Sequence, residues 1–173
     1  MPDDTVWPLE PHTGVKHDIY DGYLDAWFPI ILRSFGSGTY AEGFAGPGVY
    51  TGGEHGSPVR ALHRLREMRR RLPELRDRPA RFVLVEKRRD RVEELIARFR
   101  DELNDPMPGG EYRDPTLHVV IRRGTCEQTL HEGYPAQVLD DGRITGTHTR
   151  PQELPAARPH PAGIQPVVRS GKA

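Results

Sequence analysis

The sequence has one cysteine, no long apolar run and no secretory signal. Cys126 on its own excludes an internal disulfide framework and suits a reducing cytoplasm. The longest apolar run, residues 26–32, contains a proline and is far too short to span a bilayer. The first four residues are Met-Pro-Asp-Asp and lack the basic and apolar segments of a signal peptide. These absences predict a soluble cytoplasmic protein.

Apolar residues are also scarce, at 35% of the 173 residues, whereas the chain holds 17 prolines and 18 glycines. The length suits one domain, but this composition predicts that part of the chain is irregular.

The net charge of zero hides a strong asymmetry along the chain. Residues 1–57 hold eight acidic and two basic residues, a net charge of −6, whereas residues 58–91 hold thirteen basic and five acidic residues, a net charge of +8. An arginine-rich stretch can bind nucleic-acid phosphates. Only Phe82 offers a ring for base stacking there, so we favour a solvated helix face over nucleic-acid binding.

The N-terminal region predicts an extended segment followed by a helix. Pro8 and Pro11 disfavour helix before them, and Thr13 can cap the helix that follows. Pro29 ends this helix or opens a second turn. The apolar residues between these points recur at helical spacing: Tyr20, Tyr23, Leu24 and Trp27.

Two glycine clusters and a second helix come next. A short strand over residues 39–42 runs into the first cluster at 43–48, and the second cluster lies at 52–56. Ser57 as N-cap and Pro58 at the first helical position indicate a helix start. The apolar stripe of this helix comprises Leu62, Leu65, Met68 and Leu72.

Two further apolar runs predict strands. Residues 81–86 are typical of a buried parallel strand, and residues 116–121 form another. Residues 104–114 contain two prolines and two glycines, which predicts a loop. The helix between the strands has the most regular amphipathic period of the chain: Val92, Leu95, Ile96, Phe99 and Leu103.

Helix and strand alternate in this reading, which predicts βαβ units, a parallel sheet and an α/β fold. Three strands would make an incomplete doubly wound layer. Residues 131–173 hold 11 prolines and glycines among 43 residues and no periodicity, so we expect this tail to be disordered. The predicted division is an N-terminal segment at 1–38, an incomplete nucleotide-binding half at 39–130 and the tail at 131–173.

Three polar features follow the ends of the three predicted strands. The glycine turn follows Glu42, Glu86 ends the second strand, and Thr125 follows the third. Open α/β sheets bind ligands at the carboxyl ends of their strands. We therefore predict a nucleoside site in which Glu42 and the glycines hold one end, Glu86 binds ribose hydroxyls, and Thr125 lies beside the base. The glycine spacing is not the dinucleotide fingerprint.

Other chemistry is less supported by the residues. His12 and His17 are five apart and do not share a helix face, so we read them as capping or surface groups, although either could act as an acid or base in a site built by the N-terminal segment. We predict no metal site, since no Cys/His set completes one. Cys126 is interpreted as a small buried hydrophobe rather than a nucleophile. The chain has no P-loop and no Gly-x-Ser-x-Gly elbow.

Several sequence blocks together resemble the three-Cys-motif partner protein family, TcmP. The resemblance covers about residues 6–130 and is carried by blocks in order: WPLEPHT at 7–13, KH at 16–17, YLDAWFP at 23–29, GFAGPGVY at 43–50, GGE at 52–54 and GSP at 56–58.

That family is similar to class I methyltransferases, so the resemblance implies a Rossmann-like three-layer sandwich that binds S-adenosylmethionine. It implies that Glu86 is the ribose-binding acid. It also implies a partner, a three-Cys-motif protein that looks like a radical S-adenosylmethionine enzyme. The first methyltransferase motif would comprise Glu42, Gly43, Phe44, Ala45, Gly46 and Gly48.

The chain departs from the family after the third strand. Relatives continue with a helix and a fourth strand that ends in an Asp-Pro-Phe-Gly-like motif, and neither occurs here. We therefore expect a shortened member, with a reading frame broken near residue 131 and methyl transfer impaired. One alternative is a non-enzymatic partner of the three-Cys-motif protein. The weakest alternative is nucleic-acid binding through the arginine stretch.

Overall fold

The computed structural model describes residues 4–131, which form four α-helices and a four-stranded sheet. The sheet order is β1-β2-β4-β3, with β1, β2 and β4 parallel and β3 antiparallel to β4. This confirms the predicted α/β fold with an N-terminal helix and three parallel strands, although β3 makes the sheet a mixed one. The elements are α1 (Pro11–Phe35), β1 (Gly38–Glu42), α2 (Ser57–Arg71), η1 (Pro73–Leu75), β2 (Ala80–Glu86), α3 (Arg89–Leu103), η2 (Pro108–Gly110), β3 (Glu111–Arg113), β4 (Leu117–Arg123) and α4 (Cys126–His131).

Helix α1 is longer than predicted. It starts with Pro11 rather than after a Thr13 cap, and it continues through Pro29 to Phe35. Gly36 then ends it in a left-handed conformation, with φ of 75° and its N–H donating to the Leu32 carbonyl. An interior proline normally ends or kinks a helix because it removes one hydrogen bond. Here α1 continues because residues on both sides of Pro29 are buried in the core: Leu24, Phe28 and Leu32.

The start of α2 also corrects the prediction. Gly56 is the N-cap and Ser57 is already helical, with no side-chain capping bond. The Ser57 hydroxyl donates a hydrogen bond to Glu42 instead. A capping serine accepts a backbone N–H from the N-cap position, and Gly56 occupies that position here.

The region predicted to be a loop, residues 104–114, contains η2 and the short strand β3. Glu111, Tyr112 and Arg113 pair with β4 in antiparallel register. Gly109 and Gly110 take positive φ values of 66° and 75° and turn the chain into this strand. Three residues are too few to show a strand period, so the pattern could not reveal β3.

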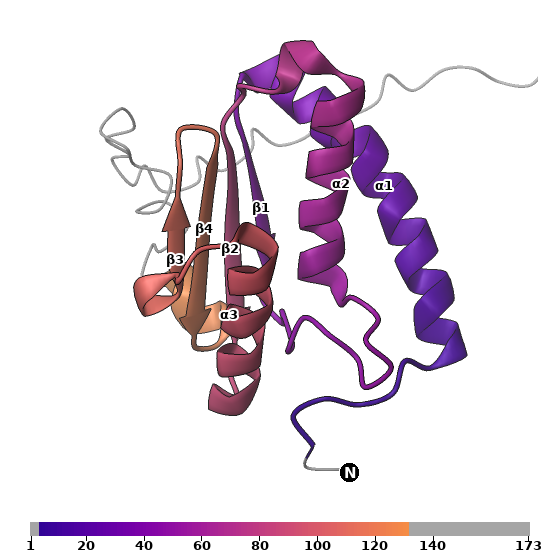
Figure 1. Ribbon diagram of the computed structural model, residues 1–173, viewed down its shortest axis with the longest axis vertical. Coiled ribbons are helices and arrows are strands. Elements are labelled where there is room, and N and C mark those ends of the chain that lie inside the picture. The colour runs from indigo at the N-terminus through magenta and orange to yellow at the C-terminus, as the bar shows by residue number, and fades with distance from the viewer. Residues whose placement is uncertain (1–3, 132–173) are drawn as a thin grey trace, which may run out of the picture.

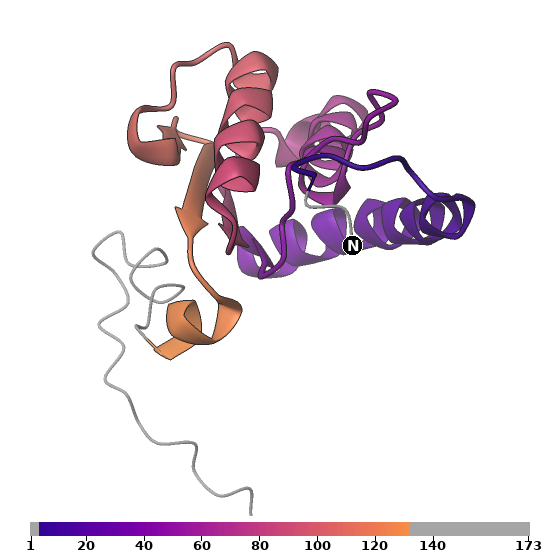
Figure 2. The same ribbon diagram turned by 90° about the horizontal axis from the view of Figure 1, so that it is seen from below.

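The core lies on one face of the sheet. Alternate strand residues, among them Tyr40, Phe82 and Val119, pack with buried residues of α1, α2 and α3. Figures 1 and 2 show these three helices on one side of the strands, with α1 and α2 lying side by side. The carboxyl ends of the parallel strands thus meet the starts of α2 and α3 at one edge.

The predicted tail falls almost wholly outside the described residues, and so does the expected break of the reading frame. Of the predicted tail, only His131 is described, as the last residue of α4. Within residues 4–131, no helix has the length and apolar character needed to cross a membrane.

Candidate functional site

A pocket of about 490 Å³ opens at the carboxyl ends of β1 and β2. Loop residues after β1 form one side, and Glu86 with the residues that follow it forms another. The first residues of α2 close the base. The lining comprises Trp7, Phe44, Ala45, Gly46, Pro47, Gly48, Val49, Tyr50, Gly56, Ser57, Glu86, Lys87, Arg88 and Arg91.

The glycine loop, residues 43–48, lies close to the end of β2 because two of its glycines have positive φ. Gly46 and Gly48 have φ of 64° and 77°, a conformation that L side chains rarely adopt. A Cβ on Gly48 would lie only 2.7 Å from Leu95 Cδ1 on α3. The Ala45 N–H donates to the Val85 carbonyl at 3.0 Å. The glycines thus let the loop follow the end of β2 and pack against α3.

Glu86 is the acidic group of the pocket. It is only 7% exposed, and its two oxygens accept hydrogen bonds from the backbone N–H groups of Gly46, at 3.0 Å, and Arg88, at 2.9 Å. A carboxylate offers about four lone-pair sites, so these two bonds leave room for further donors. The bonds hold the carboxylate in place beside the loop.

An aromatic wall comes from the N-terminal segment. The Trp7 ring meets the Tyr50 ring edge-on, with 6.0 Å between centroids, and the Arg91 guanidinium carbon lies 4.5 Å from the Trp7 ring centroid. The Thr51 N–H donates to the Trp7 carbonyl and fixes the segment over the loop. Trp7 and Tyr50 fall in the sequence blocks above, but sequence reasoning assigned neither to the site.

Three basic residues border the same pocket: Lys87, Arg88 and Arg91. Arg88 is paired with Asp90 through two hydrogen bonds, at 3.0 and 2.6 Å. The rule that located Glu86 at a strand end also covers the residues directly after it, so the sequence could have indicated these basic groups.

Glu42 lies outside the pocket lining, in a partly buried hydrogen-bond chain. Its carboxylate accepts hydrogen bonds from the hydroxyls of Tyr40 and Ser57, and Tyr20 donates to Tyr40. Burial raises the pKa of Glu42 above its ordinary value of 4.5, although the two hydrogen bonds oppose this. Burial likewise raises the pKa of Tyr20 and Tyr40. Glu42 reaches the pocket only through Ser57, which lines it.

Two other predicted site residues also lie outside the lining. A Cβ on Gly43 would be 2.6 Å from the sulfur of Cys126, so α4 packs directly on this glycine. Thr125 caps α4: its hydroxyl accepts the Gln128 N–H, and the Gln128 side chain accepts the Thr125 N–H. The five predicted residues that do line the pocket are Phe44, Ala45, Gly46, Gly48 and Glu86.

The N-terminal histidines and the cysteine have different surroundings. His12 is exposed and lies 3.2 Å from Glu10. His17 is buried, which corrects its reading as a surface or capping group, and its Nε2 lies 3.4 Å from the Tyr50 hydroxyl. Burial lowers the pKa of His17 below 6.5. Cys126, expected to be a buried hydrophobe, is only partly buried.

Sequence reasoning predicted no metal site, yet the fold gathers three metal-ligand side chains. His55, His63 and Glu102 each place one ligand atom within 4.8 Å of the others. Their sequence separations match no ligand motif, so only the tertiary fold, which brings the loop before α2, α2 itself and the end of α3 together, could reveal this group.

Comparison of this chain with protein-family models, curated proteins and solved structures found no match. The class that the observations define is therefore a structural one: an α/β domain with a pocket at the carboxyl ends of its parallel strands.

Proposed function

We propose that this pocket binds S-adenosylmethionine and that the protein is a methyltransferase-like member of the three-Cys-motif partner family. The observation that carries the proposal is Glu86, a buried carboxylate at the end of β2 that lines the pocket and accepts a hydrogen bond from Gly46 of the glycine loop. An acid in this position can accept hydrogen bonds from ribose hydroxyls. The eight predicted site residues, five of them in the lining, remain a prediction about ligand contact.

The residues present are chemically suited to such a ligand. The pocket volume falls within the range of roughly 300–1,000 Å³ that small-molecule sites occupy. Phe44 is 85% exposed and offers a face for a base, and the rings of Trp7 and Tyr50 line the same pocket. The Nε of Arg91 is buried and has no hydrogen-bond partner in the described part of the chain, so a small shift would offer a donor to an anionic group.

S-adenosylmethionine bound here would supply an activated methyl group. The chain's own residues would bind and orient it. Glu86 would accept hydrogen bonds from the ribose, the basic residues would pair with the carboxylate, and the backbone of the glycine loop would lie against the ligand. Residues 4–131 contain no counterpart of the strand that carries the Asp-Pro-Phe-Gly-like motif in relatives. We therefore propose cofactor binding in a partial Rossmann-like sandwich, with methyl transfer impaired.

Isothermal titration with S-adenosylmethionine tests the proposal. Phe44→Ala and Phe35→Ala form a matched pair, because both rings are exposed, at 85% and 75%, but only Phe44 borders the pocket. Loss of one base-stacking ring costs about 1–3 kcal/mol, so we expect Phe44→Ala to bind at least about fivefold more weakly. Phe35→Ala should bind like the wild type. We also expect Glu86→Gln to weaken binding, with circular dichroism checking its fold.

No binding heat at millimolar S-adenosylmethionine would overturn the proposal. Equal affinity in the wild type and Phe44→Ala would place the ligand elsewhere on the molecule.

A second candidate function is that of a non-enzymatic partner, favoured by the outer face of α1. Four apolar residues recur on this face and are 59–70% exposed: Val15, Ile19, Tyr23 and Ile30. Their spacing places them on one side of the helix, opposite the buried residues. Ile19→Ser with Ile30→Ser should abolish association with the three-Cys-motif protein while leaving S-adenosylmethionine binding intact. Unchanged association would count against this surface.

A further inference from the structure

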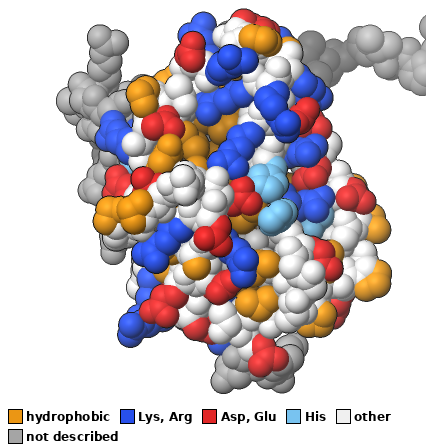
Figure 3. All heavy atoms as spheres, in the orientation of Figure 1, with side chains coloured by type: hydrophobic (Ala, Val, Ile, Leu, Met, Phe, Trp, Pro, Cys, Tyr) orange, Lys and Arg blue, Asp and Glu red, His pale blue; other side chains and the backbone are white. Residues whose placement is uncertain are grey.

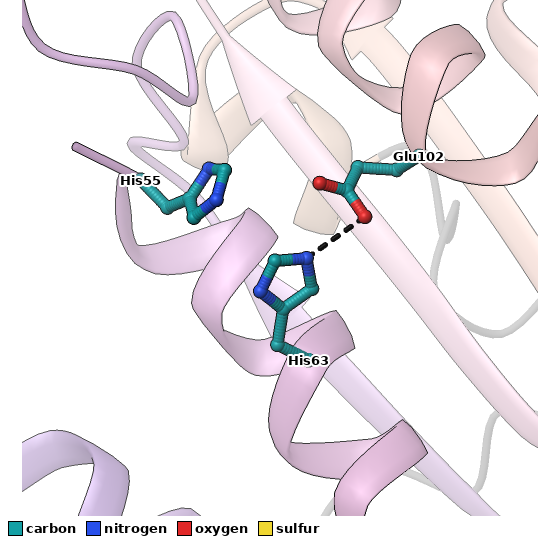
Figure 4. A group of neighbouring side chains, drawn as sticks. All are labelled: His55, His63 and Glu102. Atoms are coloured by element: carbon teal, nitrogen blue, oxygen red, sulfur yellow. Dashed lines mark hydrogen bonds and ion pairs between the residues drawn. The ribbon is translucent and has the colours of Figure 1, made fainter. Parts of the chain in front are cut away.

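Three side chains from three separate elements converge at the surface between α2 and α3. His55 lies in the loop before α2, His63 on α2 and Glu102 on α3 (Figure 4). His63 Nε2 lies 2.8 Å from a Glu102 carboxylate oxygen. The His55 and His63 rings meet edge-on, with 4.7 Å between centroids. On the face shown in Figure 3, histidine side chains lie in the open among acidic and basic groups.

The backbone at each of the three residues is fixed by secondary structure or by hydrogen bonds. His55 pairs with Val49 in an isolated β-bridge, and the next residue, Gly56, donates its N–H to the Gly48 carbonyl at 2.8 Å. His63 follows the buried Leu62 on α2. Glu102 lies in the last turn of α3, three residues after the buried Phe99. The cluster is therefore positioned by the fold and not by the three side chains alone.

We propose that His55, His63 and Glu102 bind a divalent transition-metal ion, with zinc as the best match. Two imidazole nitrogens and one carboxylate oxygen form a recognised zinc ligand set, which leaves a fourth position for water or an external ligand. The same set also suits other first-row divalent ions. The proposal is independent of the S-adenosylmethionine pocket.

The ligand atoms are close to the separation that an ion requires. Tetrahedral ligands at 2.0–2.1 Å from zinc lie roughly 3.3 Å from one another. In this structure the corresponding atoms lie within 4.8 Å, and His63 and Glu102 are already at hydrogen-bond distance. Figure 4 shows the His55 ring beside the side chains of His63 and Glu102. Rotation of the His55 side chain would bring its ligand nitrogen to the distance that an ion requires.

Arg66 holds the Glu102 side chain in place through hydrogen bonds. It donates to the same Glu102 oxygen at 2.8 Å and also to the Glu102 backbone carbonyl. A carboxylate has about four lone-pair sites, so it can accept from Arg66 and bind an ion as well. Outer groups that orient a ligand in this way are common in metal sites.

A bound ion would join the β1–α2 loop to α3. Gly56 and Ser57, directly after His55, line the pocket, so the ion would fix that part of its wall. An ion that binds only the folded chain also raises the unfolding temperature by mass action.

Zinc titration of the whole chain, first stripped with a chelator, tests the proposal. We expect one high-affinity zinc per chain by calorimetry, visible absorption bands when cobalt replaces zinc, and a rise of roughly 5–11 °C in Tm at a hundredfold excess over Kd. His55→Ala and His63→Ala should each weaken zinc binding at least tenfold.

His118→Ala is the matched control. His118 pairs with Glu111 at 2.8 Å, as His63 pairs with Glu102, but it belongs to no three-ligand group in residues 4–131. It should bind zinc like the wild type. If His63→Ala does not fold, His55→Ala decides, because it leaves the His63–Glu102 pair intact. Absence of stoichiometric zinc binding, or equal affinity in His55→Ala and the wild type, would overturn the proposal.

Discussion

Gly48 shows why a single glycine matters at the pocket. Its φ of 77° disfavours any L side chain, and a Cβ there would lie 2.7 Å from Leu95 Cδ1. Gly53 has a φ of 88°, but a Cβ on it would meet nothing within 4 Å. Both glycines therefore have a positive φ that favours glycine, and they differ only in how close a Cβ would come to neighbouring atoms.

We predict that Gly48→Ala destabilises the fold by about 2–5 kcal/mol, because a left-handed alanine costs roughly 1–2 kcal/mol and overpacking adds roughly 1–3 kcal/mol. Gly53→Ala should cost only about 1–2 kcal/mol. Urea unfolding of both variants measures the difference. Equal losses of unfolding free energy in the two variants would mean that Leu95 on α3 moves aside for the new methyl group at little cost.

Glu42 shows how a predicted ligand group can serve the core instead. It was predicted to hold a nucleoside, but its carboxylate lies outside the pocket lining and accepts hydrogen bonds from Tyr40 and Ser57. Burial raises its pKa, so the protonated form is favoured by folding. The stability this contributes is full below the ordinary pKa of 4.5 and is lost as pH rises through the folded pKa.

We predict that Glu42→Gln gains stability relative to the wild type as the pH rises from 5 to 8, since glutamine has no charge to bury. Each unit of pKa shift corresponds to about 1.4 kcal/mol. The measurement is the difference in unfolding free energy between the two proteins across this range, in which the other titrating groups cancel. A difference that does not change with pH would contradict the raised pKa.

At the scale of elements, α1 has two different sides. Its inner side is buried with Leu24, Phe28 and Leu32, whereas its outer side exposes apolar residues such as Ile19. Polar contacts tie α1 to α2 beside the core. Asp21 accepts two hydrogen bonds from Arg60, at 3.2 and 2.8 Å, and both side chains are less than a quarter exposed.

We predict a coupling free energy of about 1–2 kcal/mol between Asp21 and Arg60 in a double-mutant cycle with alanine, because the pair is two-pronged and partly buried. Arg89 and Glu93 on α3 form the control pair, at 2.8 Å but 77% and 61% exposed. Their coupling should not exceed about 0.5 kcal/mol. Equal couplings would show that the Asp21–Arg60 pair contributes no more to stability than an exposed pair.

At the scale of the whole molecule, the acidic N-terminal part of the sequence forms ion pairs with the basic part that follows it. Acidic groups of α1 pair with arginines of α2, as Asp25 does with Arg64 and Arg71. Figure 3 shows acidic side chains interspersed among the basic ones on the displayed face. Part of the positive charge of residues 58–91 is thus paired with acidic groups of α1.

The sequence alone determined the alternation of helices and strands, the parallel sheet and the position of Glu86. Apolar periodicity and turn residues are local signals, and the ends of parallel strands must share one edge. It could not reveal β3, whose three residues carry no period, or the passage of α1 through Pro29, which depends on burial in the core.

Only the tertiary structure decided which side chains meet. It separated Glu42, Gly43 and Thr125 from the pocket that Glu86 lines, and it brought Trp7 and Arg91 into that pocket. It also gathered His55, His63 and Glu102 from positions far apart in the chain. The reason is physical: such contacts follow from how helices pack on the sheet, and no local pattern in the sequence encodes that packing.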